Sequence, residues 1–523
     1  TNPILRRTFG AVLCGSGMTP ASDLLLKSTQ PATTTSIQIT VLTRFADSPV
    51  DWRKAADALA DKTPGDVTSR FAAHRAWWGA FWERSWIFIS GTSDAHLATQ
   101  AYALQRFVTA CAGRGRLPIK FNGSLFTVDE VLDPDYRRWG GPYWLQNTRL
   151  PYWSMLYSGE YAMMQPLFRM VLDALPLRRA AAKTYFRHDG AYYPETFHFW
   201  GNYADRNYGF NRGNLPPGIP ENGFIRRHWV GILEIVAMML DYYEATEDHD
   251  FRDTMLVPLA VETLRFYDQH WKRGADGKIR YQPSQSLETY GDTVNPTPDI
   301  AGVRYLLPRL LQLSVDDSIR AEWKKQLADQ PEIPMATEDG KTRILPAQHF
   351  GKRSNGENPE LYAVFPFRLF SLASASEEDL RTGLNTYHAR LHRANRGWQQ
   401  GPIWAAMLGL TEEARTLVVQ RAREKAKGYR FPGFYGPNYD WTPDQDQIAV
   451  FQIGLQYMLM QCEGDKILLL PAWPKDWDVS FKLHAPKNTT IECEVKDGKV
   501  VTLTVSPESR RNSVMKETAP SPR

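Results

Sequence analysis

One acidic residue stands in an unusual loop near the middle of the chain. Residues 281–299 read YQPSQSLETYGDTVNPTPD, so Glu288 follows a Pro-Ser-Gln-Ser run in a window without any basic residue. Loops carry chemistry more often than the elements that they connect. Apolar and aromatic surroundings raise the pKa of a carboxylic acid, because its charged form loses solvation, and a general acid for a glycosidic oxygen needs this property. The alternative is a surface glutamate that caps a turn.

Four further loops place amides or acids beside aromatic rings. They are residues 144–153 (WLQNTRLPYW), 194–203 (PETFHFWGNY), 355–362 (NGENPELY) and 439–447 (YDWTPDQDQ). Gln146 and Asn147 offer donors and acceptors at the start of a helix, although an Asn there can also be a simple cap. Asp446 likewise either caps a helix or orients an amide or a water. Together the loops indicate a neutral, polyhydroxylated ligand.

The composition of the chain excludes several classes of function. Lys+Arg of 62 against Asp+Glu of 58 gives a net charge of +4, and the absence of long basic blocks argues against a nucleic-acid partner. The chain holds 17 Trp, 23 Tyr and 24 Phe, which suits stacking on sugars, although most of these rings must fill the core. The four cysteines match no metal spacing, so we expect no metal and no cofactor. Glu234 interrupts the longest apolar run, Val230 to Leu240, which excludes a membrane span.

The period of the apolar residues predicts a mainly α protein with β segments at both ends. Apolar spacing near 3.6 predicts helices over 96–111, 147–159, 161–177, 228–246, 250–271, 300–311, 317–327, 359–372, 377–388, 398–408, 412–427 and 446–462. This number of helices fits an (α/α)6 barrel, a toroid of six helical hairpins. After Cys462 the period changes to two, and strands are expected at 466–470, 479–483, 490–495 and 500–505, with a hairpin turn at Asp497-Gly498.

These patterns predict five parts of the chain. They are a β segment that ends an N-terminal β-sandwich (1–47), a helical linker (48–92), the catalytic (α/α)6 barrel (93–463), a small C-terminal β-sandwich (464–506) and a disordered tail (507–523). Because the chain begins at Thr1, we expect a processed protein or a fragment. We expect a secreted or periplasmic location, and the sequence predicts no particular oligomeric state.

Four segments occur in the order found in one known family. They are residues 144–153 (WLQNTRLPYW), 283–288 (PSQSLE), 446–461 (DQIAVFQIGLQYMLMQ) and 468–477 (LLLPAWPKDW). In this order they resemble glycoside hydrolase family 95, the inverting α-L-fucosidases, and related (α/α)6 enzymes. The resemblance covers roughly residues 90–480. It implies that Glu288 is the general acid, that Asn147 positions the attacking water and that Asp446 polarises this amide–water pair.

Two departures from the family leave the sugar and the base open. The first Asn of the family motif falls on Leu145, and the histidine-rich loop of the family is replaced by residues 355–362. Either the chain is a divergent branch of the family with another glycone, or Glu357 or Glu360 acts as the base for the attacking water. For inversion, we expect Glu288 to face Asp446 and Asn147 across one pocket with a wide carboxylate spacing.

The sequence therefore predicts an exo-acting, inverting hydrolase of an α-linked sugar, similar to an α-L-fucoside or α-galactoside, in an oligo- or polysaccharide. The alternatives are a carbohydrate-binding pseudoenzyme and an inverting glycoside phosphorylase on the same barrel. The predicted substrate-binding residues are Trp144, Gln146, Arg149, Trp153, Glu195, His198, Trp200, Asn202, Glu357, Glu360, Trp398 and Trp404.

Overall fold

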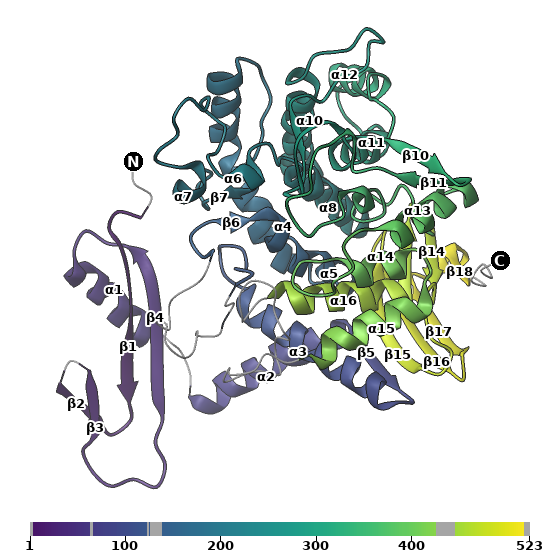
Figure 1. The fold of residues 1–523 in the computed structure, drawn as a ribbon. Coiled ribbons are helices and arrows are strands. Elements are labelled where there is room, and N and C mark those ends of the chain that lie inside the picture. Colours follow the sequence, from purple (N-terminus) through teal and green to yellow (C-terminus); the bar gives the residue numbers. More distant parts are fainter. Residues whose placement is uncertain are drawn as a thin grey trace. The chain divides into compact units, whose positions relative to one another are not determined.

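The computed structural model describes residues 4–22, 24–62, 66–122, 125, 139–424 and 445–516. The chain divides into two compact units, Thr1–Glu83 and Arg84–Arg523, each of which is described by itself. Three of the expected sequence boundaries (47/48, 92/93 and 463/464) stay predictions. Figure 1 gives the helix and strand labels that are used below.

The first unit is a small α/β arrangement. Strands β1 (Arg7–Gly15) and β4 (Ile37–Phe45) pair antiparallel, and β2 (Met18–Ser22) and β3 (Leu25–Ser28) form a second pair. Helix α1 (Pro49–Asp61) begins at the Ser48 cap, whose side chain accepts from the Asp51 backbone N–H. The ring of Trp52 lies so close to Gly10 that a Cβ there would come within 2.6 Å of it, so glycine lets the helix dock on the sheet. Helix α2 (Val67–Arg84) follows.

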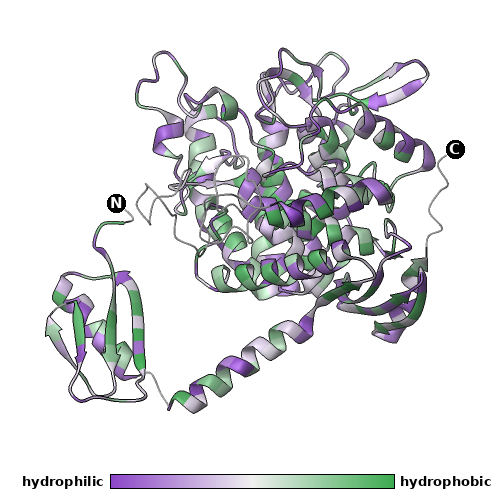
Figure 2. Ribbon diagram, turned by 60° about the horizontal axis from the view of Figure 1, so that its bottom comes forward, coloured by the Kyte–Doolittle hydropathy of each residue, from purple (hydrophilic) through white to green (hydrophobic). Residues whose placement is uncertain are grey.

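The second unit is rich in helices, as its apolar period predicts. Its longer helices are α3 (Ser93–Ala112), α5 (Leu150–Ser158), α6 (Tyr161–Phe186), α8 (Gly231–Thr246), α10 (Val257–Gln269), α11 (Thr297–Leu310), α12 (Asp317–Ala328), α13 (Glu377–Ala389), α15 (Thr411–Arg423) and α16 (Gln445–Leu459). Figure 2 shows apolar residues concentrated on the helices in the middle of this unit. Every residue of α5 and α16 is buried, so these two helices lie in its core.

One predicted helix is absent. Residues 359–372 form only the short 3-10 helix η3 (Pro359–Ala363), followed by turns. Pro366 explains the early end, because proline has no backbone N–H to bond the carbonyl four residues earlier and its ring collides with that carbonyl.

The strands after residue 463 form as predicted, but their sheet includes a strand from the other end of the unit. The four-stranded sheet has the order β17 (Lys499–Ser506), β16 (Thr489–Lys496), β15 (Asp478–Ala485), β5 (Trp86–Ser90), and all its pairs are antiparallel. The β16–β17 turn holds Asp497 and Gly498 at φ of 50° and 69°, the left-handed geometry of a two-residue hairpin. Because β5 pairs with β15, part of the predicted 48–92 linker belongs to this sheet.

The predicted disorder is wrong for the first part of the tail. Residues Glu508–Ser513 form the 3-10 helix η4, and β18 (Val514–Lys516) pairs in parallel with β14 (Lys466–Leu469). Arg511 donates a hydrogen bond to the Leu503 backbone oxygen at 3.1 Å, so the charged composition of this segment is used in contacts with the strands. Residues 517–523 lie outside the described residues.

Candidate active site

A short helix presents two neighbouring amide side chains. Strand β6 (Tyr143–Trp144) pairs with β7 (Thr196–Phe197), and helix α4 (Leu145–Thr148) begins directly after β6. Glu195, the residue before β7, accepts two hydrogen bonds from the start of α4. Its backbone oxygen accepts from the Leu145 N–H at 3.0 Å, and its carboxylate Oε1 accepts from the Gln146 N–H at 2.7 Å. These two bonds hold the backbone of α4 that carries Gln146 and Asn147.

The two amides reach two carboxylates that are far apart in sequence. Gln146 Nε2 donates to Glu288 Oε1 at 3.0 Å, and Asn147 Nδ2 donates to Asp446 Oδ2. All four side chains are buried, Glu288 being 8% exposed and Asp446 0%. The structure thus brings together the three predicted catalytic residues, Glu288, Asn147 and Asp446, through adjacent positions of one helical turn. Residues 439–444, the first part of the predicted loop before Asp446, lie outside the described residues.

Glu288 lies in the turn between strands β8 (Ser284–Ser286) and β9 (Tyr290–Pro296). Its second carboxylate oxygen, Oε2, accepts from Asn355 Nδ2 at 2.8 Å. The orientation of the Asn355 amide is set by its own Oδ1, which accepts the Gly356 N–H at 2.7 Å. Hydrogen bonds to both oxygens favour the ionised carboxylate, whereas burial favours the protonated form.

The Gln146 amide can serve either protonation state of Glu288. Its own oxygen, Oε1, has no hydrogen-bond partner among the described residues. A half-turn of this amide would place Oε1 where Nε2 now stands, ready to accept a proton from a neutral Glu288. The Gln146 amide can therefore either donate to Glu288 or, after the half-turn, accept from it, while Asn355 stays in place.

Glu357 and Glu360, the alternative bases, lie in different places. Glu357 Oε2 accepts from the Glu288 N–H at 3.1 Å and from the Thr289 hydroxyl at 2.8 Å, so it lies against the backbone of the Glu288 turn. Burial raises the pKa of Glu357, against the hydrogen bonds that it accepts. Glu360 instead lines a separate cavity with Tyr290 and Phe350, where burial raises its pKa to about 7.

Two residues predicted to bind substrate are bound to protein in the interior instead. Arg149 forms an ion pair with Glu234 and donates to the Tyr362 hydroxyl at 2.8 Å. The Trp153 indole N–H donates to Glu234 at 2.7 Å. Both side chains are at most 2% exposed, so neither offers a face to a sugar. Both side chains instead form buried contacts with Glu234 of α8.

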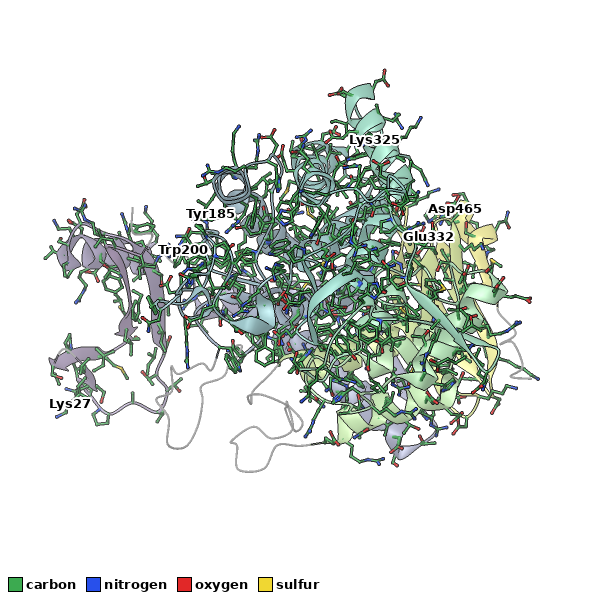
Figure 3. All side chains as sticks on the ribbon, turned by 45° about the horizontal axis from the view of Figure 1, so that its top comes forward. Lys27, Tyr185, Trp200, Lys325, Glu332 and Asp465 are labelled. Carbon is green, nitrogen blue, oxygen red and sulfur yellow. The ribbon has the colours of Figure 1, made fainter. Side chains whose placement is uncertain are left out.

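The predicted loop at 194–203 is divided between interior and surface. His198 and Trp200 stack on each other with centroids 4.3 Å apart, and Asn202 is exposed. Gly201, between them, packs on Ala174 of α6, and Figure 3 shows Trp200 at the edge of the second unit.

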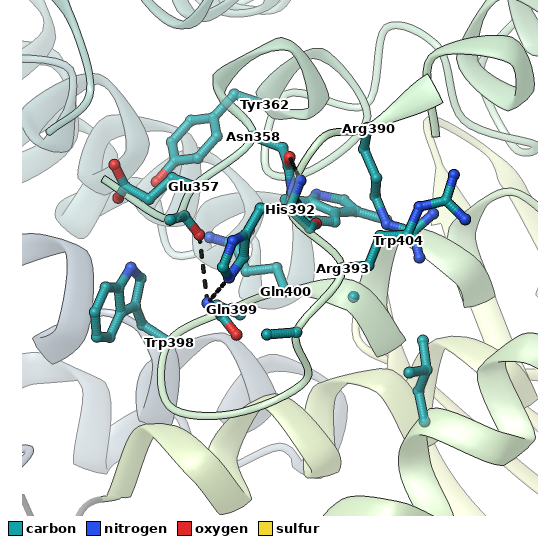
Figure 4. A pocket seen from close by; sticks show the side chains of 14 residues that line it. Glu357, Asn358, Tyr362, Arg390, His392, Arg393, Trp398, Gln399, Gln400 and Trp404 are labelled. Carbon is teal, nitrogen blue, oxygen red and sulfur yellow. Dashed lines mark hydrogen bonds between the residues drawn. The ribbon is translucent and has the colours of Figure 1, made fainter. Parts of the chain in front are cut away.

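The remaining predicted aromatics are buried near the site. Trp144 packs with Phe121 and Ile225. Trp398 and Trp404 line a cavity together with Glu357 (Figure 4). The Trp398 indole lowers the pKa of Glu357 as a hydrogen-bond donor, although burial outweighs this effect.

Sequence reasoning missed two functional positions. Asn355 lies in the loop 355–362 that the sequence analysis singles out. No sequence pattern shows that its amide, rather than that of Asn358, donates to Glu288. Glu234 carries a clearer signal. A charged residue inside the apolar run Val230–Leu240 predicts a buried partner, which proves to be Arg149.

Glu195 has a structural role that its position in the sequence did not predict. The residue is 1% exposed, and its carboxylate Oε2 has no hydrogen-bond partner among the described residues, with His228 Nε2 at 3.7 Å. Burial raises the pKa of Glu195 to about 8, while the Gln146 N–H and Arg149 oppose the shift and Glu357 and Glu234 add to it. Near neutral pH the Glu195 side chain is therefore mainly uncharged, and it accepts a hydrogen bond from the start of α4.

This raised pKa predicts a specific pH dependence of stability. Unfolded Glu195 ionises near its model value of 4.5, so between that pH and about 8 the native state binds the extra proton and stability falls as pH rises. From pH 6 to pH 8 the loss from this group is about 2 kcal/mol. Glu195→Gln keeps an acceptor for the Gln146 N–H and should lose that much less over the same interval.

Urea unfolding at the two pH values, followed by tryptophan fluorescence, measures the difference between wild type and E195Q. Glu195→Ala is the matched comparison, because it also removes the charge but leaves the Gln146 N–H without its acceptor. It should be less stable than E195Q at both pH values. Identical pH slopes for wild type and E195Q would contradict the assignment.

Among the described residues, no group of three or more His, Cys, Asp or Glu side chains is placed to hold a metal ion. No helix in the described part of the chain is long and apolar enough to cross a membrane.

Comparisons with known proteins give a family and a fold. Residues 1–87 match a domain of unknown function (DUF5703), and residues 80–436 match the glycosyl hydrolase family 95 catalytic domain. No curated protein matches significantly. A solved structure named provisionally as a kojibiose phosphorylase from the human microbiome is similar with a TM-score of 0.62 and 15% identity. The match covers 94% of this chain and 70% of that one. At this identity the likeness shows the fold alone.

Proposed function

The chain belongs to the glycosyl hydrolase family 95 catalytic-domain family, and from this premise we propose that it is an inverting, exo-acting glycoside hydrolase. Its substrate is an α-linked sugar, similar to an α-L-fucoside or an α-galactoside, at the end of an oligo- or polysaccharide. It needs no metal and no cofactor.

A single observation carries the proposal. The adjacent amides of Gln146 and Asn147 bind two different carboxylates, Glu288 and Asp446. An inverting mechanism needs one carboxyl group on each side of the anomeric carbon, one to protonate the leaving oxygen and one to serve the water. A rigid turn between the two groups holds them at a fixed separation.

The reaction is then a single displacement. Glu288 donates its proton to the glycosidic oxygen as the bond from that oxygen to the anomeric carbon breaks. A water held by the Asn147 amide attacks the same carbon from the opposite face, and its proton passes to Asp446. Because Leu145 offers no amide where the family has its first Asn, Asn147 and Asp446 carry the positioning of the water without it.

The helix contacts support the full (α/α)6 closure as part of the proposal. The last helices of the second unit, α15 and α16, pack on α3, the first one, as expected when a ring of helices closes on itself. We further propose that β15–β17 belong to a C-terminal β-sandwich, which β5 joins, that the domain boundaries lie at 47/48, 92/93 and 463/464 apart from β5, and that the protein acts in a secreted or periplasmic compartment.

A glycoside phosphorylase is the second candidate, because a structural neighbour is named for that activity. It would use the same acid, but inorganic phosphate would replace water and the product would be a sugar 1-phosphate. The proposed site around Asn147 and Asp446 carries a carboxylate rather than a cluster of cations, and a carboxylate repels phosphate.

A panel of α-linked substrates tests the function. Aryl and natural α-L-fucosides, α-galactosides and α-glucosides should be incubated with the protein in phosphate-free buffer and in phosphate. We expect free sugar at the same rate in both buffers. Activity that requires phosphate and yields a sugar 1-phosphate would contradict hydrolysis and support the glycoside phosphorylase.

A further inference from the structure

Two amide side chains bind the two carboxylate oxygens of Glu288. Asn355 Nδ2 donates to Oε2 at 2.8 Å, and Gln146 Nε2 donates to Oε1 at 3.0 Å. An amide carries a donor at one end and an acceptor at the other. The orientations open to each amide therefore decide which protonation state of Glu288 it favours.

The Asn355 amide is fixed by its own loop. Its Oδ1 accepts the Gly356 backbone N–H at 2.7 Å, so a half-turn would set the Nδ2 donor against this N–H. Gly356 is itself held in place. A Cβ there would lie 3.0 Å from the His392 ring, and Gln399 Nε2 donates to its backbone oxygen at 3.3 Å (Figure 4). Asn355 therefore presents a donor to Glu288 in both protonation states.

The loop that carries Asn355 is bound to the Glu288 turn on both sides of this residue. The Ser354 hydroxyl donates to the Glu288 backbone oxygen at 2.8 Å, and the Glu357 carboxylate accepts from the Glu288 N–H at 3.1 Å. Arg353 donates to the backbone oxygens of Asn355 and Glu357 at 2.8 and 2.7 Å. These contacts hold the Asn355 amide against Oε2.

Gln146 differs from Asn355, because its amide can turn. The residue is 5% exposed, and its Oε1 has no hydrogen-bond partner among the described residues. It can donate to an ionised Glu288 or, after a half-turn, accept from a neutral one. A proton on Oε2 of Glu288 would point at the Asn355 donor, whereas a proton on Oε1 finds an acceptor in Gln146.

We propose that Asn355 is a positioning residue for the general acid, which keeps Oε2 of Glu288 unprotonated and makes Oε1 the atom that protonates the glycosidic oxygen. The inference rests on the proposed function and adds the donor atom and the residue that selects it. In the reaction the glycosidic oxygen replaces the Gln146 amide on Oε1 and takes the proton. The electron pair of the broken O–H bond stays on the carboxylate, whose charge Asn355 stabilises.

The titration of Glu288 distinguishes the two amides. Asn355→Leu removes a donor that favours only the charged form, so the pKa of Glu288 should rise by about 1. Gln146→Met removes a partner of both forms, so the pKa should change by less than about 0.5. Asn355→Asp still accepts the Gly356 N–H but places a like charge beside Oε2, so it should raise the pKa more than N355L does.

The other charged and titratable groups around the Glu288 turn are the same in every variant. They are Arg149, Glu195, Tyr290, Arg353, Glu357 and Asp446. A rise of the pKa in N355L that Q146M does not show therefore comes from the lost Asn355 hydrogen bond.

Infrared difference spectra between each protein and its Glu288→Gln counterpart isolate the carboxyl band of Glu288 across the pH range, without turnover. Asn512→Leu, at an exposed position of η4, is the matched control and should leave the titration unchanged. Equal rises of the pKa in N355L and Q146M, or no rise in N355L, would overturn the proposal.

The pH dependence of hydrolysis tests the same assignment through catalysis. A general acid must be protonated, so kcat/KM on an α-linked disaccharide falls as the pH rises through the pKa of Glu288. In N355L this fall should occur about 1 pH unit higher. A merely structural role of Asn355 would lower kcat/KM at every pH without moving the fall.

The two measurements separate this inference from the proposed function. A raised pKa of Glu288 in N355L, without hydrolysis of any glycoside by the wild type, supports the role of Asn355 and contradicts the proposed function. Hydrolysis by the wild type, with the same pKa of Glu288 in wild type and N355L, would reject the role of Asn355 alone.

Discussion

Glu288→Gln should reduce kcat/KM on a natural α-linked disaccharide by about 10³–10⁴-fold, and on an activated aryl glycoside by only about 10-fold. A sugar alkoxide is a poor leaving group and must be protonated as the bond breaks, whereas a nitrophenolate leaves without a proton. A glutamine side chain cannot donate that proton. Steady-state kinetics on the two substrates, with the same glycone, measures the difference.

The substitution should leave the structure intact. The oxygen of the new amide can accept from Asn355, as Glu288 does, and its nitrogen can donate to the free oxygen of Gln146 after that residue's amide makes a half-turn. Glu338→Gln, on the exposed hairpin β10 (Met335–Glu338) to β11 (Lys341–Ile344), controls for the loss of one carboxylate. Small and equal losses on both substrates would remove Glu288 from the role of general acid.

Asp446→Asn should behave in the opposite way, with a loss of about 10³-fold on both substrates. Every substrate needs an activated water, however good its leaving group is. Asn147→Ala should also lower both, by about 10²-fold, because the water loses its positioning amide. Since Asn147 and Asp446 are hydrogen-bonded to each other, the double variant should be little worse than D446N alone.

The same experiment decides between Asp446 and Glu357 as the partner of the water. Glu357 accepts from the backbone of the Glu288 turn, which places it beside the acid rather than across from it. We therefore expect Glu357→Gln to lose far less than D446N on the aryl glycoside. If E357Q lost kcat/KM severely and equally on both substrates while D446N lost little, Glu357 rather than Asp446 would be the base. Circular dichroism spectra of all variants should match that of wild type.

The helical framework and the loops of the site could be predicted from sequence because both depend on local patterns. Apolar spacing located α8 and α11, and alternation located β15 and β16. The Pro-Ser-Gln-Ser-Leu-Glu segment singled out Glu288 because an acid among small polar residues differs from its surroundings.

The rest depends on long-range contacts that no local pattern encodes. The segment at Trp86–Ser90 becomes strand β5 only because β15, almost four hundred residues later, offers it an edge. Glu357 and Glu360 are three residues apart, yet Glu357 accepts a hydrogen bond from the Glu288 backbone N–H and Glu360 lines a separate cavity. The aromatic rings of Trp153 and Trp200 look alike in sequence, and only packing places the first in the core and the second at the edge.

The anomeric configuration of the first product tests the account most directly. Proton NMR during the earliest turnover of an α-linked substrate distinguishes α from β free sugar before mutarotation mixes them. With Glu288 donating the proton and a water held by Asn147 and Asp446 attacking from the other face, the first product should be the β anomer. A first-formed α anomer would require a covalent glycosyl-enzyme and would contradict the water-binding role of Asn147 and Asp446.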